Sequence, residues 1–177
     1  HSSLSTQGGN DIISIKADAG VLGARFVNSP ILATGLESSS VNTGAGNDFV
    51  SLQSIARGRT TATAYGSTDS SIDLGSGNDS LLINASATGA GSWWRGGTVA
   101  AYGALNTTIN TAGETSEGAP PMGHENDSVV FLGFGEDPAI GNDNDSIVIN
   151  ASATNWGRGR RGYAEAIGLG DRSSINT

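Results

Sequence analysis

The sequence predicts an all-β fold, a parallel β-solenoid of about four long coils plus one short coil. Three observations predict it: a Gly-Asn-Asp motif recurs along the chain, a strand pattern with a period of two residues follows each copy, and no long helical pattern is present. Internal repeats of this kind are typical of solenoids, because one coil cannot bury a core alone but a stack of coils can.

Composition narrows the class of protein further. The 177 residues include 27 glycines, no cysteine and a single lysine, Lys16, and the net charge is −8. A net negative charge argues against a nucleic-acid partner, since a phosphate backbone needs a basic surface. The absence of cysteine excludes disulfides and thiolate metal sites. No apolar run is long enough to span a membrane, so we expect no membrane segment.

The recurring motif defines the repeats within a single domain, 1–177. Its aspartates are separated by 37, 31, 48 and 18 residues, and they are Asp11, Asp48, Asp79, Asp127 and Asp145. The repeats are approximately 2–38, 39–69, 70–106 and 107–172. Residues 112–123 of the last repeat, with Pro120 and Pro121, look like a loop insertion, and residues 127–145 are expected to form the short coil.

The strand after each motif shows alternating apolar residues. Stacking the coils turns these residues into inward ladders, with large side chains near the turn and small ones at the far end. The predicted inward residues are Ile13, Ile15, Ala17 and Ala19, then Val50, Leu52, Ser54 and Ala56, then Leu81, Ile83, Ala85 and Ala87, and finally Ile147, Ile149, Ala151 and Ala153. A third strand with an Ala-x-Gly segment recurs after a variable loop, as in Ala64–Gly66 and Ala101–Gly103.

The chemistry of the turn points to a metal. Glycines in unusual backbone conformations expose carbonyl oxygens. Together with aspartate carboxylates they offer the hard oxygen ligands that Ca²⁺ prefers. One turn supplies too few ligands, so the ion is expected between the turns of successive coils. The predicted ligand residues are Asp11, Gly44, Gly46, Asp48, Gly75, Gly77, Asp79, Asp127, Gly133, Gly135, Asp137, Asp143 and Asp145. The alternative is a metal-free tight turn in which Asn and Asp bond their own backbone.

Three segments, Gly44–Val50, Gly75–Leu81 and Gly133–Ala139, resemble the nonapeptide calcium-binding repeat of RTX proteins. The pattern of that family is Gly-Gly-x-Gly-x-Asp-x-apolar-x. The resemblance implies a secreted parallel β-roll that binds Ca²⁺ between its turns and folds when calcium is present. The first copy departs from the pattern at Gln7, the fourth at Glu125 and the last at Asp143.

The loops after the long strands share aromatic and arginine residues. Because they occupy equivalent places in the unit, they are expected to form a stripe that stacks sugars or meets a protein partner. The stripe consists of Trp93, Trp94, Arg95, Trp156, Arg158, Arg160 and Tyr163. The alternative is a set of local cation–π pairs that cover a thin core.

Two further features concern modification and catalysis. Asn84 and Asn150 lie in Asn-x-Ser/Thr triplets at outward strand positions and are candidate glycosylation sites. Two histidines, His1 and His124, and no cysteine leave little for acid–base or nucleophilic catalysis, so the chain is not expected to be an enzyme.

The first and last segments of the chain occupy the same place in the repeat, namely Ser2–Thr6 and Ser173–Thr177. An uncapped array of this kind indicates either a piece excised from a longer array or head-to-tail association of identical chains, and we expect the latter. The expected function is therefore that of a secreted calcium-binding structural protein, a self-assembling extracellular fibre or surface-layer component. The alternatives are an adhesin or carbohydrate-binding module, and the non-catalytic calcium-binding tail of a secreted enzyme.

Overall fold

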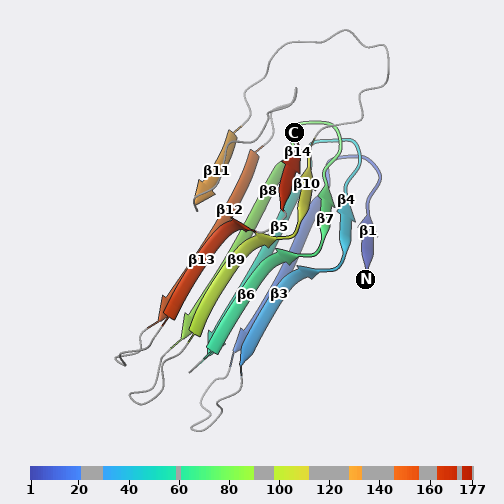
Figure 1. Ribbon diagram of the computed structural model, residues 1–177. Coiled ribbons are helices and arrows are strands. Elements are labelled where there is room, and N and C mark those ends of the chain that lie inside the picture. Colours follow the sequence, from blue (N-terminus) through green and yellow to red (C-terminus); the bar gives the residue numbers. More distant parts are fainter. Residues whose placement is uncertain are drawn as a thin grey trace.

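The fold is a parallel β-solenoid, as the sequence predicts (Figure 1). The computed structural model describes residues 1–20, 30–58, 61–89, 98–111, 128–132, 146–155, 163–170 and 173–176. These residues form 14 strands in three sheets, and every strand pairing within the sheets is parallel. No helix in this part of the chain is long and apolar enough to cross a membrane.

Each coil contributes one strand to each sheet. The first sheet contains, in order, β1 (Ser3–Ser5), β4 (Ser40–Asn42), β7 (Ser71–Asp73), β10 (Thr108–Asn110) and β14 (Ser174–Asn176). The second contains β11 (Ser128–Leu132), β12 (Ser146–Asn155), β8 (Ser80–Gly89), β5 (Phe49–Gly58) and β2 (Ile12–Gly20). The third contains β13 (Tyr163–Gly170), β9 (Thr98–Leu105), β6 (Thr61–Thr68) and β3 (Ile31–Glu37). We call β1–β3 coil 1, β4–β6 coil 2, β7–β9 coil 3, and β10, β12 and β13 coil 4.

The strand pairing in the first sheet gives the number of residues in each coil. Ser3 pairs with Ser40, Ser40 with Ser71, Ser71 with Thr108 and Thr108 with Ser174. These pairings correspond to successive offsets of 37, 31, 37 and 66 residues. Coil lengths vary while the strands stay in register, because the extra residues lie between the strands.

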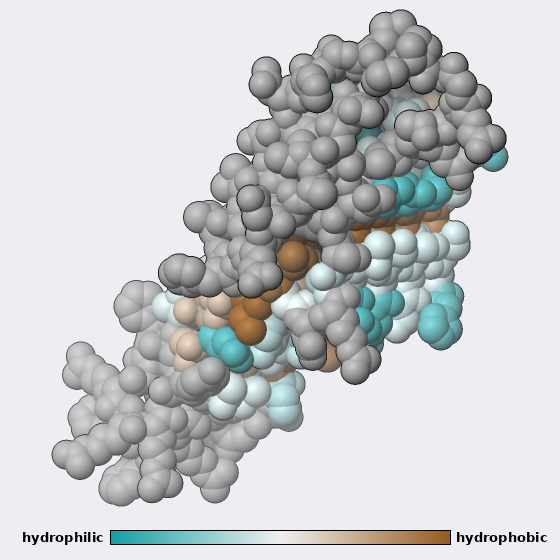
Figure 2. Space-filling view, turned by 45° about the horizontal axis from the view of Figure 1, so that its top comes forward, coloured by the Kyte–Doolittle hydropathy of each residue, from teal (hydrophilic) through white to brown (hydrophobic). Residues whose placement is uncertain are grey.

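The predicted inward ladders form the core. Ile13, Val50, Leu81 and Ile147 pair across successive coils of the second sheet, and all four are buried. Large side chains gather in one cluster with Leu52 and Ile83, whereas a second cluster, built around Ala56, Ala64 and Ala87, contains mainly alanine. The predicted gradient from large to small side chains is therefore confirmed. Figure 2 shows residues of like hydropathy in parallel rows across the coils, a brown row beside paler and teal ones.

The glycine of the recurring Ala-x-Gly segment is required by close packing between two sheets. A Cβ added at Gly66 would overlap the Cγ2 of Ile83 and the carbonyl oxygen of Gly103. A Cβ added at Gly103 would overlap Ile149 and the carbonyl of Gly168 in the same way. The third sheet thus approaches the isoleucines of the second sheet at a position where no side chain fits.

Among the described strands, β11 lies at a place in its sheet that departs from its order in the chain. β12 pairs directly with β8, with Ser146 opposite Ser80, although β11 lies between β8 and β12 in sequence. β11 pairs with the other edge of β12, where Ser128 lies opposite Ser146, an offset of 18 residues. The described strand of the predicted short coil, β11, is thus the outer strand of the second sheet beyond β12.

Candidate metal-binding corner

The Gly-Asn-Asp turns of coils 1, 2 and 3 stack into one corner between the first and second sheets. Bridges between Gly8 and Ala45 and between Ala45 and Ser76 continue the parallel pairing through the turns. The described glycines and aspartates of the predicted ligand set therefore lie in common columns. They are Asp11, Gly44, Gly46, Asp48, Gly75, Gly77 and Asp79.

Glycine is required at two places in this corner. Gly44 and Gly75 have φ angles of +91° and +81°, which lie in the left-handed region. A Cβ added at Gly75 would also overlap the carbonyl oxygen of Gly44 in the preceding coil, and one at Gly44 would overlap that of Gln7. Gly46 and Gly77 form a second column, in which an added Cβ would likewise overlap a backbone carbonyl oxygen of the preceding coil. The glycines permit both the turn and the close stacking of the coils.

The aspartates form a ladder directed toward the preceding coil. Oδ1 of Asp48 accepts a hydrogen bond from the backbone N–H of Asp11 at 2.8 Å, and Oδ1 of Asp79 accepts one from the N–H of Asp48 at 2.9 Å. Asp48 is 2% exposed and Asp79 1% exposed. Each carboxylate thus links its own coil to the preceding one and is removed from water.

The asparagines form a second ladder that runs the opposite way. The backbone N–H of Asn47 donates to Oδ1 of Asn10 at 2.9 Å, and the N–H of Asn78 donates to Oδ1 of Asn47 at 2.9 Å. The sequence analysis did not include these asparagines among the site residues. Their presence in each copy of the motif was a signal that could have identified them.

One carboxylate oxygen in each of two coils lacks a hydrogen-bond donor. Oδ2 of Asp11 and Oδ2 of Asp48 are buried and accept no hydrogen bond. The described ion pair between Arg57 and Asp18 lies on the second sheet, away from the corner. A buried carboxylate without a countercharge is unfavourable, so the corner has the electrostatic character of a cation site.

The donor set fits calcium only when side chains and backbone act together. Within the described ranges, no group of three or more Asp, Glu, His or Cys side chains is placed to hold a metal ion. Backbone carbonyls or water must therefore complete the six to eight oxygens that Ca²⁺ takes. The carbonyl of Gly44 already accepts the N–H of Ser76 at 3.0 Å, so it has one lone pair left to contribute.

A groove beside the corner holds another aspartate in a different environment. It has a volume of about 400 Å³, and its lining includes Asn42, Asp73 and Asn110. The side-chain amide of Asn42 donates to one oxygen of Asp73 at 3.1 Å, and that of Asn110 donates to the other at 3.0 Å. Both oxygens of Asp73 have donors, which distinguishes this carboxylate from that of Asp48.

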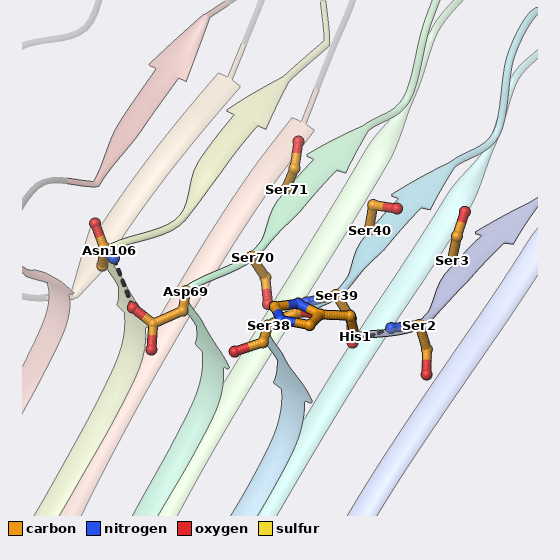
Figure 3. Close-up of a pocket in the computed structure, with 10 residues that line it drawn as sticks. All are labelled: His1, Ser2, Ser3, Ser38, Ser39, Ser40, Asp69, Ser70, Ser71 and Asn106. Carbon is orange, nitrogen blue, oxygen red and sulfur yellow. Dashed lines mark hydrogen bonds between the residues drawn. The ribbon is translucent and has the colours of Figure 1, made fainter.

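A polar depression of about 620 Å³ lies at a different corner of the coils, the one where the third sheet leads into the first (Figure 3). Its lining consists of His1, Ser2, Ser3, Ser38, Ser39, Ser40, Asp69, Ser70, Ser71 and Asn106. The hydroxyls of Ser39 and Ser70 donate to the backbone carbonyls of Glu37 and Thr68, each at 2.6 Å. These hydroxyls are therefore used to shape the turn.

Several predicted site residues lie outside the described part of the chain. They are Asp127, Gly133, Gly135, Asp137, Asp143 and Asp145 of the metal set, and Trp93, Trp94, Arg95, Trp156, Arg158 and Arg160 of the aromatic and arginine stripe. Tyr163 begins β13, where its backbone pairs with Thr98. The predicted stripe thus stays a prediction.

The two candidate glycosylation sites are neighbours in the second sheet. Asn84 and Asn150 pair in register, and the side-chain amide of Asn150 donates to Oδ1 of Asn84 at 2.8 Å. Both side chains are half-buried. A glycan on Asn150 would be attached through this donating nitrogen, which would keep one of its two N–H groups.

Comparison of the chain with family models, with curated proteins and with solved structures gave no match.

Proposed function

We propose that this chain is a calcium-stabilised structural scaffold, with ions held along the corner formed by Asp11, Asp48 and Asp79. The observation that carries the proposal is the carboxylate of Asp48. It is 2% exposed, one of its oxygens accepts a single backbone N–H, and the other oxygen has no donor.

The hydrogen bonds of the aspartate ladder compensate only part of the negative charge. Coils in register stack about 4.8 Å apart, so successive carboxylates repel one another at short range. A divalent cation offsets that repulsion and the cost of burial at once, since it supplies positive charge to two neighbouring coils. When bound, calcium would act here as a cross-link between coils.

The side-chain composition favours calcium over transition metals. Carboxylate and carbonyl oxygens are hard ligands, and the chain has no cysteine to supply a soft one. Sites with few charged ligands bind calcium weakly, at dissociation constants of about 10⁻⁴–10⁻³ M in extracellular modules. The proposal therefore places the chain outside the cell and gives it a structural role, with no catalytic one.

Other expectations stay predictions. The head-to-tail fibre or surface-layer component is a proposal about how such a scaffold assembles. The adhesin or carbohydrate-binding alternative depends largely on the aromatic and arginine stripe, which lies outside the described residues. The alternative of an enzyme's calcium-binding tail depends on sequence beyond this chain.

The proposal is tested by thermal unfolding with calcium and with chelator, followed by circular dichroism. Calcium at about 100 times its dissociation constant stabilises the folded state by about 2.7 kcal/mol. For a chain of this size such a gain raises the melting temperature by about 5–10 °C. Identical melting curves in calcium and in EGTA, with no heat of calcium binding by calorimetry, would identify the corner as a metal-free hydrogen-bond ladder.

A further inference from the structure

Two of the three tyrosines of the chain are stacked on each other across neighbouring coils. Tyr65 in β6 pairs in register with Tyr102 in β9. The ring centroids are 5.0 Å apart, and the ring planes are inclined by 12°. Neighbouring strands of a sheet are separated by about 4.8 Å, so the stacking follows directly from the register of coils 2 and 3.

The pair stands on the outer face of the third sheet. Its chain neighbours Ala64 and Ala101 are fully buried in the alanine cluster, and successive side chains of a strand point to opposite faces. The side chains of Tyr65 and Tyr102 are half-buried. The hydroxyl of Ser54 donates to the backbone carbonyl of Tyr65 at 2.5 Å and holds that strand in place from the inside. The two phenols are therefore fixed at their backbone and accessible from solvent.

We propose that Tyr65 and Tyr102 are the site of a dityrosine cross-link that joins coils 2 and 3. The chain has no cysteine, so no disulfide can bind one coil to the next. Two phenols held in contact are an oxidative alternative. The required oxidant is hydrogen peroxide acting through a haem peroxidase. This cross-link goes beyond the calcium scaffold and does not depend on calcium.

The coupling balances as a two-electron oxidation. Each phenol gives up one electron and its hydroxyl proton, and peroxide takes both electrons and both protons to become two molecules of water. The two phenoxyl radicals join by a bond between one ring carbon ortho to each oxygen. The hydrogen on each of these carbons then moves to the oxygen and restores the phenol. The chain loses two hydrogen atoms in all.

Glu165 gives the proton of one phenol an acceptor. The hydroxyl of Tyr102 donates to Oε2 of Glu165 in β13 at 2.9 Å, a distance at which a carboxylate can take a proton directly. Loss of the electron from Tyr102 can thus be accompanied by loss of its proton. The same hydrogen bond orients the ring against Tyr65.

The third tyrosine provides the matched control. In β13 the residue opposite Tyr102 is Ile167, and Tyr163 lies four residues earlier, which is about 13 Å along the strand. Tyr65→Phe, Tyr102→Phe and Tyr163→Phe each leave two tyrosines in the chain. Only Tyr163→Phe keeps the stacked pair.

Oxidation of the folded chain by peroxidase and peroxide, at low protein concentration and in EGTA, tests the proposal. Dityrosine fluorescence of the monomer fraction gives the yield, and mass spectrometry of the digested monomer identifies the joined peptides and the loss of two hydrogen atoms. Wild type and Tyr163→Phe should give equal yields. Because proximity of the two rings drives the coupling, Tyr65→Phe and Tyr102→Phe should give yields lower by about tenfold or more.

The melting temperature supplies a second measurement. A bond between residues 37 apart restricts the unfolded chain as a disulfide does, so the cross-linked monomer should melt about 5 °C or more above the untreated one. Circular dichroism establishes that each variant is folded before oxidation.

Two outcomes would overturn the proposal. The first is an absence of dityrosine in the wild-type monomer under conditions that couple free N-acetyltyrosine. The second is a yield in Tyr65→Phe or Tyr102→Phe that equals that of the wild type. Since the whole series is run in EGTA, neither outcome bears on the calcium proposal, which is judged on the melting of the unoxidised wild type with and without calcium.

Discussion

The backbone N–H of Asp11 donates to Oδ1 of Asp48 in the next coil, and Oδ2 of the same carboxylate is buried without a donor. The two oxygens of one side chain thus have different roles. Oδ1 connects the coils whether or not a metal is present, whereas Oδ2 is available to a cation. This division allows the two roles to be separated by a single substitution.

Asp48→Asn should remove the calcium response while keeping the connection between coils. Asparagine retains an Oδ1 acceptor for the N–H of Asp11 but carries no charge. In EGTA we expect its melting temperature to stay close to that of the wild type. In saturating calcium the variant should gain less than half of the increase that the wild type gains, as measured by circular dichroism.

Asp18→Asn is the control for that experiment. It removes the same charge from the outer face of β2, where Asp18 pairs with Arg57. Its calcium response should match that of the wild type. If both variants lose the response equally, general acidity of the chain is responsible and the corner is not.

Gly75→Ala should be far more damaging than Gly9→Ala. Both positions have positive φ, so each substitution costs about 1–2 kcal/mol from the backbone alone. At Gly75 the new Cβ also overlaps the carbonyl of Gly44, which adds about 1–3 kcal/mol or more. Urea unfolding should show a clearly lower midpoint for Gly75→Ala, and equal midpoints would contradict the tight stacking of coils 2 and 3.

Gly66→Ala tests the approach of the third sheet to the second. The added Cβ would overlap Ile83 and the backbone of Gly103, so we expect a loss of about 1–3 kcal/mol in the free energy of unfolding. Gly20→Ala is the matched control, because its Cβ would lie 3.4 Å from the Cβ of Arg57, a tight contact at an exposed position. Chemical denaturation should leave this control within about 0.5 kcal/mol of wild type.

Ile83→Ala should destabilise the chain through the core, by about 2–5 kcal/mol. Ile83 is fully buried at 0% exposure, whereas Ile12 is 81% exposed on the outer face. Ile12→Ala removes the same atoms from a solvated position and should change stability by about 0.5 kcal/mol or less. Thermal and urea unfolding measure the stability of both variants. A larger loss of stability for Ile12→Ala than for Ile83→Ala would contradict the assigned inward register.

The inward register could be predicted because it depends on the backbone of each strand alone. Side chains alternate between the two faces of any strand, so Leu81 and Ile83 had to share a face, and the repeats placed Val50 and Leu52 beside them. The structure confirms these pairings.

The direction of the corner ladders could not be predicted from the motif. Asp48 reaches back to coil 1, and Asn47 accepts from coil 3, although the two residues are adjacent in the chain. Which neighbour each side chain meets depends on the offset between stacked turns, and that offset is a property of the assembled solenoid. The sequence could identify the types of ligand residue. It could not identify Oδ2 of Asp48 as the buried oxygen that accepts no hydrogen bond.

The position of β11 in the second sheet also could not be predicted from the sequence. The strands Ser128–Leu132 and Ser146–Asn155 both follow a motif aspartate, and both begin with a serine followed by a run of apolar residues. Spacing alone cannot say which of them pairs with β8. The longer strand β12 matches all ten residues of β8, and β11 matches only five residues of β12.

This order has a consequence for the chain as it leaves the ribosome. Each of β4, β7 and β10 finds its sheet neighbour already synthesised, so the solenoid can grow by one coil at a time. β11 emerges before β12, the only strand in the described part of the chain with which it pairs. Among the described strands that follow coil 1, β11 must therefore wait for a later segment to dock before it can pair, so folding lags behind translation there.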